Sequence, residues 1–150
     1  MPAFTSHMPT ALSAARAAAR LGEVPVGAVL LDPQGRIVAS AGNRTEADND
    51  PTAHAEILVI REACRKLGSP RLPGYRLWVT LEPCPMCAAA ISAARIASLH
   101  YGAPDPRGGG VAHGARVFDH PQCHHRPEIY GGIDASACAD LLRDFFAARR

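Results

Sequence analysis

Apolar and polar positions along the chain switch between helical and strand-like spacing several times. Apolar residues at helical spacing predict helices over residues 8–20, 51–67 and 135–148. Short apolar runs predict strands over residues 26–31, 37–41, 77–80 and 99–102. Strands that alternate with helices in this way are typical of an α/β fold, in which helices pack on the faces of a sheet.

Turn and capping residues mark where these elements begin and end. The segment Asp32-Pro33-Gln34-Gly35 separates the first two strands and predicts a β-hairpin. Asp50-Pro51 predicts the start of the second helix, with Asp50 as N-cap and proline in the first helical position, and Gly68 predicts its end. Glu82-Pro83 predicts the opening of a further helix that runs to about Ile96.

Composition sets modest bounds on the protein. The chain has 150 residues, 47% of them hydrophobic, so we expect one domain over residues 1–150 with a substantial core. It contains neither an apolar run of membrane-spanning length nor a basic and then apolar leader, so we expect a soluble, cytoplasmic protein. Five cysteines, an odd number, agree with a reducing compartment. A net charge of +2 is too weak to indicate nucleic-acid binding by itself.

Two short motifs carry the chemistry that the sequence predicts. His54-Ala55-Glu56 lies in the opening turns of the second predicted helix, and Pro83-Cys84-Pro85-Met86-Cys87 opens the next. A structural zinc site is closed by four protein ligands, whereas a catalytic site has three and keeps the fourth position for water. His54, Cys84 and Cys87 therefore predict a catalytic site with one zinc ion per chain. His-x-Glu followed by Pro-Cys-x-x-Cys is the signature of zinc-dependent nucleobase deaminases.

The places of these residues on the predicted helices suit a shared metal. Cys84 and Cys87 are three positions apart, so both sulfurs project from one face of a helix. A helix N-terminus also favours thiolate, because its unpaired N–H groups stabilise negative charge. Glu56 follows the ligand His54 by two positions, close enough to reach the water without occupying the metal. We therefore predict that Glu56 takes the proton of the water and delivers it to a ring nitrogen and then to the leaving ammonia.

The same residues have other interpretations. A lone Cys-x-x-Cys pair is also typical of redox proteins and of structural zinc sites. Glu56 would also suit the start of a helix as an acid favoured by the dipole. The run His120-Pro121-Gln122-Cys123-His124-His125 has spacing that could chelate a second metal, although clustered histidines in a polar loop are more often solvated or hydrogen-bonded.

Along almost its whole length the chain resembles the cytidine deaminase superfamily, and most closely the bacterial tRNA-specific adenosine deaminases. The motifs that carry the resemblance are, in order, residues 23–29, 42–44, 50–56, 80–84, 101–103 with Asp105, 124–125 and 142–146. The zinc motif is shared across the superfamily, whereas the segments at Tyr101 and Phe145-Phe146 are closer to this branch.

This resemblance implies a fold, a reaction and a partner. The fold would be a three-layer α/β/α arrangement with a central five-stranded mixed sheet. The reaction would be hydrolytic deamination of the wobble adenosine of tRNA to inosine. The implied partners are a tRNA anticodon loop and a second copy of the chain, in a homodimer whose tRNA site draws on both subunits. Asn43 would hydrogen-bond the flipped nucleoside, and Asp105 would contact a ribose of the anticodon loop.

Three departures from the family pattern bear on the substrate. Pro85 gives a Pro-Cys-Pro-Met-Cys motif that is also seen in relatives that deaminate free guanine or cytosine. The segments Glu46-Ala47-Asp48 and Ala97-Ser98 stand where relatives often carry basic residues, so fewer phosphate contacts are expected. Two alternatives therefore accompany the main hypothesis. One is a deaminase of a free base or nucleoside such as guanine or cytosine, and the more remote one is a non-enzymatic zinc-binding module.

Overall fold

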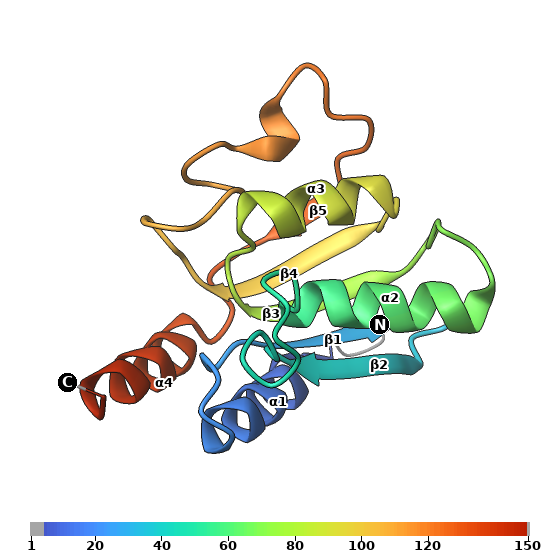
Figure 1. The fold of residues 1–150 in the computed structure, drawn as a ribbon. Helices are drawn as coiled ribbons and strands as arrows, with labels where there is room; N and C mark the ends of the chain where they lie inside the picture. The colour runs from blue at the N-terminus through green and yellow to red at the C-terminus, as the bar shows by residue number, and fades with distance from the viewer. Residues whose placement is uncertain (1–4, 150) are drawn as a thin grey trace.

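The computed structural model describes residues 5–149, which form four α-helices, a five-stranded sheet and one short 3-10 helix (Figure 1). In chain order the elements are α1 (Met8–Arg20), β1 (Gly27–Leu31), β2 (Ile37–Gly42), α2 (Ala55–Leu67), β3 (Arg76–Leu81), α3 (Pro85–Ala93), β4 (Ser98–Ala103), η1 (Val117–Asp119), β5 (Glu128–Tyr130) and α4 (Ala135–Ala147). The range of α1 matches its prediction. No helix within residues 5–149 is long and apolar enough to cross a membrane.

The sheet is mixed, with the strand order β2-β1-β3-β4-β5. β1 runs antiparallel to both β2 and β3, whereas β3, β4 and β5 run parallel to one another. β1 and β2 form the predicted hairpin, whose turn is held by the side chain of Asp32 as it accepts from the N–H groups of Gln34 and Arg36, each at 2.9 Å. The five-stranded mixed sheet implied by the family resemblance is confirmed.

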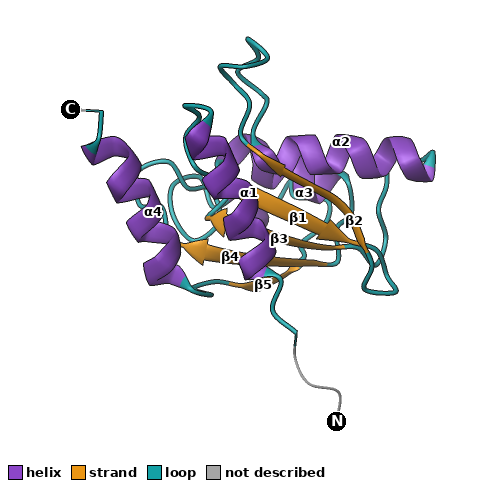
Figure 2. Ribbon diagram, turned by 90° about the horizontal axis from the view of Figure 1, so that it is seen from below, coloured by secondary structure: helices purple, strands orange, loops and turns teal. Residues whose placement is uncertain are grey.

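Helices cover both faces of the sheet, as Figures 1 and 2 show. α2 and α3 pack on one face, where Val59 and Ile91 are fully buried in a cluster with Leu77 of β3. α1 and α4 pack on the other face, where Cys138 of α4 is buried in a second cluster with Trp78 of β3. Successive side chains of a strand point to opposite faces, so Leu77 and Trp78 belong to different layers. The three-layer α/β/α fold is confirmed.

α2 begins at Ala55, later than the predicted start at Asp50-Pro51. The reason is local, because the carboxylate of Asp50 accepts hydrogen bonds from the N–H and the hydroxyl of Thr52, at 2.8 and 2.7 Å. Asp50 therefore forms a turn of its own and does not cap the helix. The first N–H of α2, that of Ala55, donates instead to the side-chain Oδ1 of Asn43 at 2.8 Å. His54 consequently stands just before the helix, in an extended conformation.

α3 is shorter than predicted at both ends. It begins at Pro85, with Cys84 as an N-cap in extended conformation, and it ends at Ala93 and not near Ile96. Proline suits the first helical position, because the N–H that it lacks would have no partner within the helix. After the helix, Arg95 takes a left-handed backbone conformation with φ of 62°, which prevents the helix from continuing to Ile96. The presence of proline at position 85 therefore has a structural explanation that does not depend on the substrate.

β5 is the strand that the hydrophobic pattern did not predict. It has three residues, of which Glu128 and Tyr130 are exposed, and it pairs with β4 at the edge of the sheet. A run of this length is too short to show a periodicity. The fifth strand was expected from the family resemblance alone.

The carboxyl ends of the parallel strands β3 and β4 lie side by side. Leu81 pairs with Ala103, and the N–H of Glu82 donates to the carbonyl of Ala103 at 2.9 Å. The chain leaves β3 toward Cys84 and leaves β4 toward Asp105. In open α/β sheets ligands bind outside this edge. The fold thus brings two segments with predicted functional residues to one place.

Candidate active site

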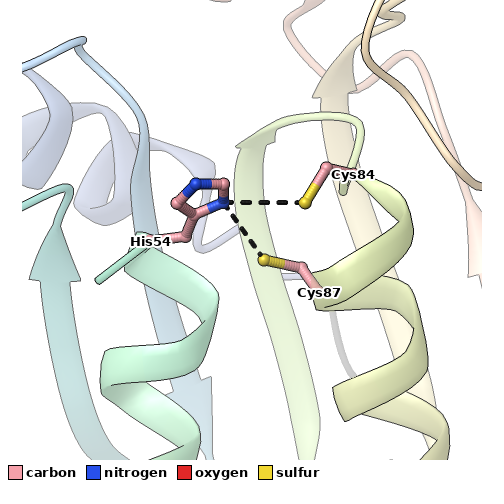
Figure 3. Close-up of side chains that lie close together, drawn as sticks. All are labelled: His54, Cys84 and Cys87. Atoms are coloured by element: carbon pink, nitrogen blue, oxygen red, sulfur yellow. Dashed lines mark hydrogen bonds between the residues drawn. The ribbon is translucent and has the colours of Figure 1, made fainter. Parts of the chain in front are cut away.

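The N-terminal ends of α2 and α3 converge, and His54, Cys84 and Cys87 face one another there (Figure 3). Nδ1 of His54 lies 3.6 Å from Sγ of Cys84 and 3.5 Å from Sγ of Cys87. Within the described residues these three form the one group of at least three His, Cys, Asp or Glu side chains whose ligand atoms all lie within 4.8 Å of one another. The fold therefore brings the three predicted ligands together.

This spacing fits a tetrahedral zinc ion. With a Zn–S bond of about 2.3 Å and a Zn–N bond of about 2.0 Å, a tetrahedral angle places nitrogen and sulfur roughly 3.5 Å apart. Imidazole and thiolate are ligands that zinc prefers, and three protein ligands leave one position open. His54 and Cys84 line a cavity, whereas Cys87 is fully buried behind them.

The two thiols of this group differ in their protonation. A hydrogen bond from Cys87 lowers the pKa of Cys84 to about 4, and the hydrogen bond with His54 acts in the same direction. The same pairing with Cys84, together with burial, raises the pKa of Cys87. The hydrogen bond to Cys84 raises the pKa of His54. A divalent cation would stabilise both thiolates, because cysteine binds metals in its deprotonated form.

Glu56 is buried beside the three candidate ligands. It lies in the first turn of α2 and is 4% exposed. Burial raises the pKa of its carboxyl to about 7, and the negative charge of Cys84 acts in the same direction. A carboxyl group with this pKa can both accept and release a proton at neutral pH. A helix-start acid favoured by the dipole alone would not need this burial beside three candidate metal ligands.

A cavity of about 300 Å³ adjoins this group of residues. Its walls include His54, Glu56 and Cys84, together with Asn43 and Asp105. The volume lies at the lower end of the range for sites that bind small molecules. All the residues predicted to bind substrate or to move protons therefore face one cavity.

Asn43 and Asp105 are both held in place by backbone N–H groups. Oδ1 of Asn43 accepts from Ala55, so the amide group of Asn43 keeps its two N–H donors for another partner. Oδ1 of Asp105 accepts from the N–H groups of Arg107 and Gly108, at 3.2 and 2.9 Å. Asp105 is thus a turn residue as well as part of the cavity wall.

Two buried carboxylates next to the cavity were missed by the sequence interpretation. Glu82, which had been placed at a helix start, has no exposed side-chain surface and accepts hydrogen bonds from Asp105, Val111, Ala112 and His113. Burial alone would raise its pKa, but hydrogen bonds led by those from Asp105 and His113 outweigh burial and lower it. Glu23 is 1% exposed and accepts from the N–H of Ala47 at 2.8 Å. Their partners lie far along the chain, so no local signal marks either residue.

The two segments in which fewer basic residues than in relatives were expected, Glu46-Ala47-Asp48 and Ala97-Ser98, lie in different surroundings. Asp48 forms an ion pair with Arg44 at 3.0 Å, so part of the acidic segment is neutralised within its own loop. Ser98 is 6% exposed at the start of β4 and pairs with Arg76. This pair lies at the opposite end of β3 and β4 from the cavity. Any effect of Ala97-Ser98 on phosphate contacts would therefore concern a part of the RNA away from the cavity, and the expectation of fewer contacts there stays a prediction.

The histidine-rich run after residue 119 serves to attach a loop. Nε2 of His125 donates to the carbonyl of Ile96 at 2.7 Å, and the N–H of His125 donates to Oγ of Ser92 at 3.2 Å. Within the described part of the chain, none of its residues belongs to a group of three or more potential ligands close enough to share one metal ion. The run therefore ties its loop to the end of α3, and a second metal site has no geometric support there.

Comparison with known proteins agrees with this geometry. The family described as the cytidine and deoxycytidylate deaminase zinc-binding region matches residues 3–103. The chain belongs to this deaminase family. The predicted membership is thereby confirmed, and the His-Cys-Cys group of this deaminase suits one zinc ion per chain.

Individual relatives show which members of the family the chain resembles. The deaminase is 57% identical to the tRNA-specific adenosine deaminase of Agrobacterium fabrum, over 97% of this chain and 95% of that protein. A solved structure from a study of A-to-I editing by tRNA:A34 deaminases is 58% identical, with a TM-score of 0.88 over 90% of this chain and 97% of that chain. A guanine deaminase from Nitrosomonas europaea has a TM-score of 0.81 at 22% identity, over 97% and 87% of the two chains. At that identity the likeness shows a shared fold alone.

Proposed function

We propose that this chain is a zinc-dependent hydrolase that converts the wobble adenosine of tRNA to inosine and releases ammonia, with residues 1–150 forming one deaminase domain. The observation that carries the proposal is the His54, Cys84 and Cys87 group beside the buried carboxylate of Glu56, in a cavity of about 300 Å³. High identity to tRNA-specific adenosine deaminases favours this substrate over a free base.

His54, Cys84 and Cys87 would hold the zinc ion. Zinc with three protein ligands and one open position acts as a Lewis acid and lowers the pKa of a bound water to about 7. The burial of Cys87 behind the other two ligands leaves substrate access from the cavity side. The three residues thereby serve as fixed donors, and no other described group competes with them.

Glu56 would move the proton during the reaction. Water adds to C6 of the adenine ring, and the carboxylate of Glu56 takes up the proton that the water loses. The carboxylic acid delivers this proton to a ring nitrogen. The carboxylate then takes the remaining proton of the added hydroxyl, as the C6 carbonyl forms, and passes it to the amino group, which departs as ammonia when its bond to C6 breaks. A pKa near 7 suits both directions of this transfer.

Asn43 and Asp105 would read the substrate from the cavity walls. Because Oδ1 of Asn43 is already engaged, its amide would donate to an acceptor on the flipped base. Oδ2 of Asp105 accepts no hydrogen bond from the described part of the chain, so it would accept from a ribose hydroxyl. A hydroxyl contact of this kind is what distinguishes RNA from DNA.

The partner would be a tRNA anticodon loop, and the protein would act in the cytoplasm as a homodimer. All five cysteines are free, which agrees with a reducing compartment. Met86, next to Cys87 at the start of α3, is 36% exposed, so an apolar side chain is open to a second subunit close to the cavity.

A direct assay separates this function from its alternatives. The protein is incubated with an anticodon stem-loop carrying adenosine at the wobble position and, separately, with free guanine, cytosine and adenosine, and ammonia release is measured. We expect release from the stem-loop at a kcat/KM far above that of any free compound. Efficient release from guanine with none from the stem-loop would establish the small-base alternative.

A further inference from the structure

Glu82 gathers donors from a loop that lies far from it in sequence. Its Oε1 accepts from the N–H of Asp105 at 3.0 Å and from Nδ1 of His113 at 2.7 Å. Its Oε2 accepts from the N–H groups of Val111, Ala112 and His113, at 3.1, 3.0 and 3.1 Å. A carboxylate offers about four lone-pair sites, so these contacts leave none for a substrate or a transferred proton.

The loop held in this way, residues 105–113, is called the rim loop here. Two of its members, Asp105 and Gly108, line the cavity together with Glu82 itself. The rim loop is also joined to the segment before Cys84, because the N–H of Gly110 donates to the carbonyl of Pro83 at 2.8 Å. Glu82 therefore links the segment that carries Cys84 to the opposite wall of the cavity.

The contact between the carboxylate and the rim loop is tight. A Cβ atom added at Gly109 would collide with Oε2 of Glu82, and it would come within 2.5 Å of the carbonyl oxygen of Asp105. Only glycine allows the backbone to approach the carboxylate so closely. The loop thus has little freedom to shift while Glu82 is ionised and in place.

We propose that Glu82 is a positioning residue that holds the rim loop and, through Asp105, sets the fit of the RNA substrate. This inference rests on the proposed function. Glu82 acts at a distance from the proton transfer, since its oxygen atoms are engaged by the rim loop and not by His54 or Glu56. Its loss should therefore change the affinity for the stem-loop more than the rate of the bound complex.

Glu82→Gln tests the proposal, because the amide keeps the size of the side chain but turns one acceptor into a donor that faces N–H groups. We expect faster hydrogen exchange of the amides of residues 105–113, unchanged zinc content, and a stem-loop KM raised by about 10- to 10²-fold, the order that loss of a hydrogen bond to a charged acceptor costs. The kcat should change little, because within the described residues the hydrogen bonds of Glu82 go to the rim loop and none joins it to Glu56. Unchanged exchange or an unchanged KM would overturn the proposal.

A double-mutant cycle with Asp105→Ala separates positioning from general destabilisation. If Glu82 acts through Asp105, the effect of Glu82→Gln on kcat/KM should largely disappear when Asp105 is already alanine. Glu23→Gln is the matched control, because Glu23 holds the loop at Ala47 and not the rim loop. Its effect should add to that of Asp105→Ala, and additivity for Glu82→Gln as well would overturn the proposal.

If Glu82→Gln does not fold, His113→Ala tests whether Glu82 positions the rim loop. The side chain of His113 is 37% exposed and supplies one of the donors to Glu82. We expect faster exchange in the rim loop and a KM raised by a smaller factor at unchanged kcat, and no change in either would overturn the proposal. If the wild-type protein does not deaminate the stem-loop, the proposed function fails, whereas exchange in Glu82→Gln still shows whether Glu82 holds the loop.

Discussion

The side chain of Asn43 and the backbone of Ala55 are joined by a hydrogen bond of 2.8 Å, in which the N–H of Ala55 donates to Oδ1 of Asn43. This contact caps α2 immediately after His54 and fixes which end of the amide faces the cavity. One residue thereby links the start of the helix, the candidate metal ligand and the candidate substrate contact.

Asn43→Asp should separate the capping role from the substrate role. The carboxylate still accepts from Ala55, so the free energy of unfolding should stay within about 0.5 kcal/mol of wild type, whereas Asn43→Ala should lose about 1 kcal/mol. Both variants lack the donor toward the base. In each, kcat/KM for the stem-loop should fall by an amount that corresponds to about 1–3 kcal/mol of lost transition-state stabilisation. Thermal unfolding and steady-state kinetics measure the two effects. Wild-type kinetics in Asn43→Asp would show that the amide does not donate to the substrate.

Removal of the two thiols should remove the metal. The purified protein should contain one zinc ion per chain, and the double variant Cys84→Ser Cys87→Ser should contain almost none, because hard hydroxyls replace the thiolates. Loss of a ligand that binds the native state also lowers Tm. Cys64→Ser is the control, since Cys64 lies outside the three-residue group and should leave the zinc in place. Full zinc content in the double variant would refute the ligand assignment.

Glu56→Ala should lower turnover by at least about 10²–10⁴-fold without loss of zinc. A general acid–base group contributes about 10²–10⁴ in rate, and the metal ligands are untouched by this change. Glu62→Ala provides a comparison on the same helix, because Glu62 forms only a surface ion pair with Lys66 at 3.3 Å. Single-turnover kinetics on the stem-loop measure both variants. A near-normal rate in Glu56→Ala would exclude Glu56 from the proton transfer.

His100 should make the stability of the protein depend on pH. It stacks between Trp78 and Tyr130, and its Nδ1 has no partner within the described residues. Burial lowers its pKa to about 4, with charges at Arg76 and His7 acting in the same direction and Glu128 opposing them.

The unfolded state therefore binds more protons between the ordinary histidine pKa of about 6.5 and pH 4. The contribution of His100 is complete above about pH 6.5 and is lost as the pH falls toward 4, by about 1–3 kcal/mol in all. His100→Phe keeps a ring in the stack and should flatten this dependence. Denaturant unfolding of both proteins across this range measures the difference, and identical profiles would exclude His100 as its source.

The parts of the site that were predictable from the sequence are local in the chain. The spacing of His54 with Glu56, and of Cys84 with Cys87, is enough to predict four side chains at two helix starts. The start of α2 was placed too early because Asp50 and Pro51 resemble a cap, whereas Asp50 bonds to Thr52.

The remaining features depend on contacts between distant segments. Glu82 accepts hydrogen bonds from Asp105 and from residues 111–113, and the hydrogen bond from Ala55 to Asn43 depends on how β2 and α2 meet. The sequence also does not show that Ser98 lies at the end of β4 away from the cavity. Such placements follow from topology, and a one-dimensional pattern does not contain them.

We infer that the protein deaminates one particular adenosine and that the buried carboxylate of Glu56, beside the candidate zinc ligands, moves the protons. The most direct test is to sequence a full-length tRNA with adenosine at the wobble position after incubation with the wild-type protein or with Glu56→Gln, since inosine is read as guanosine. We expect conversion at the wobble position alone with the wild-type protein and none with Glu56→Gln. An unchanged wobble adenosine after incubation with zinc-loaded wild-type protein, or equal conversion by both proteins, would contradict it.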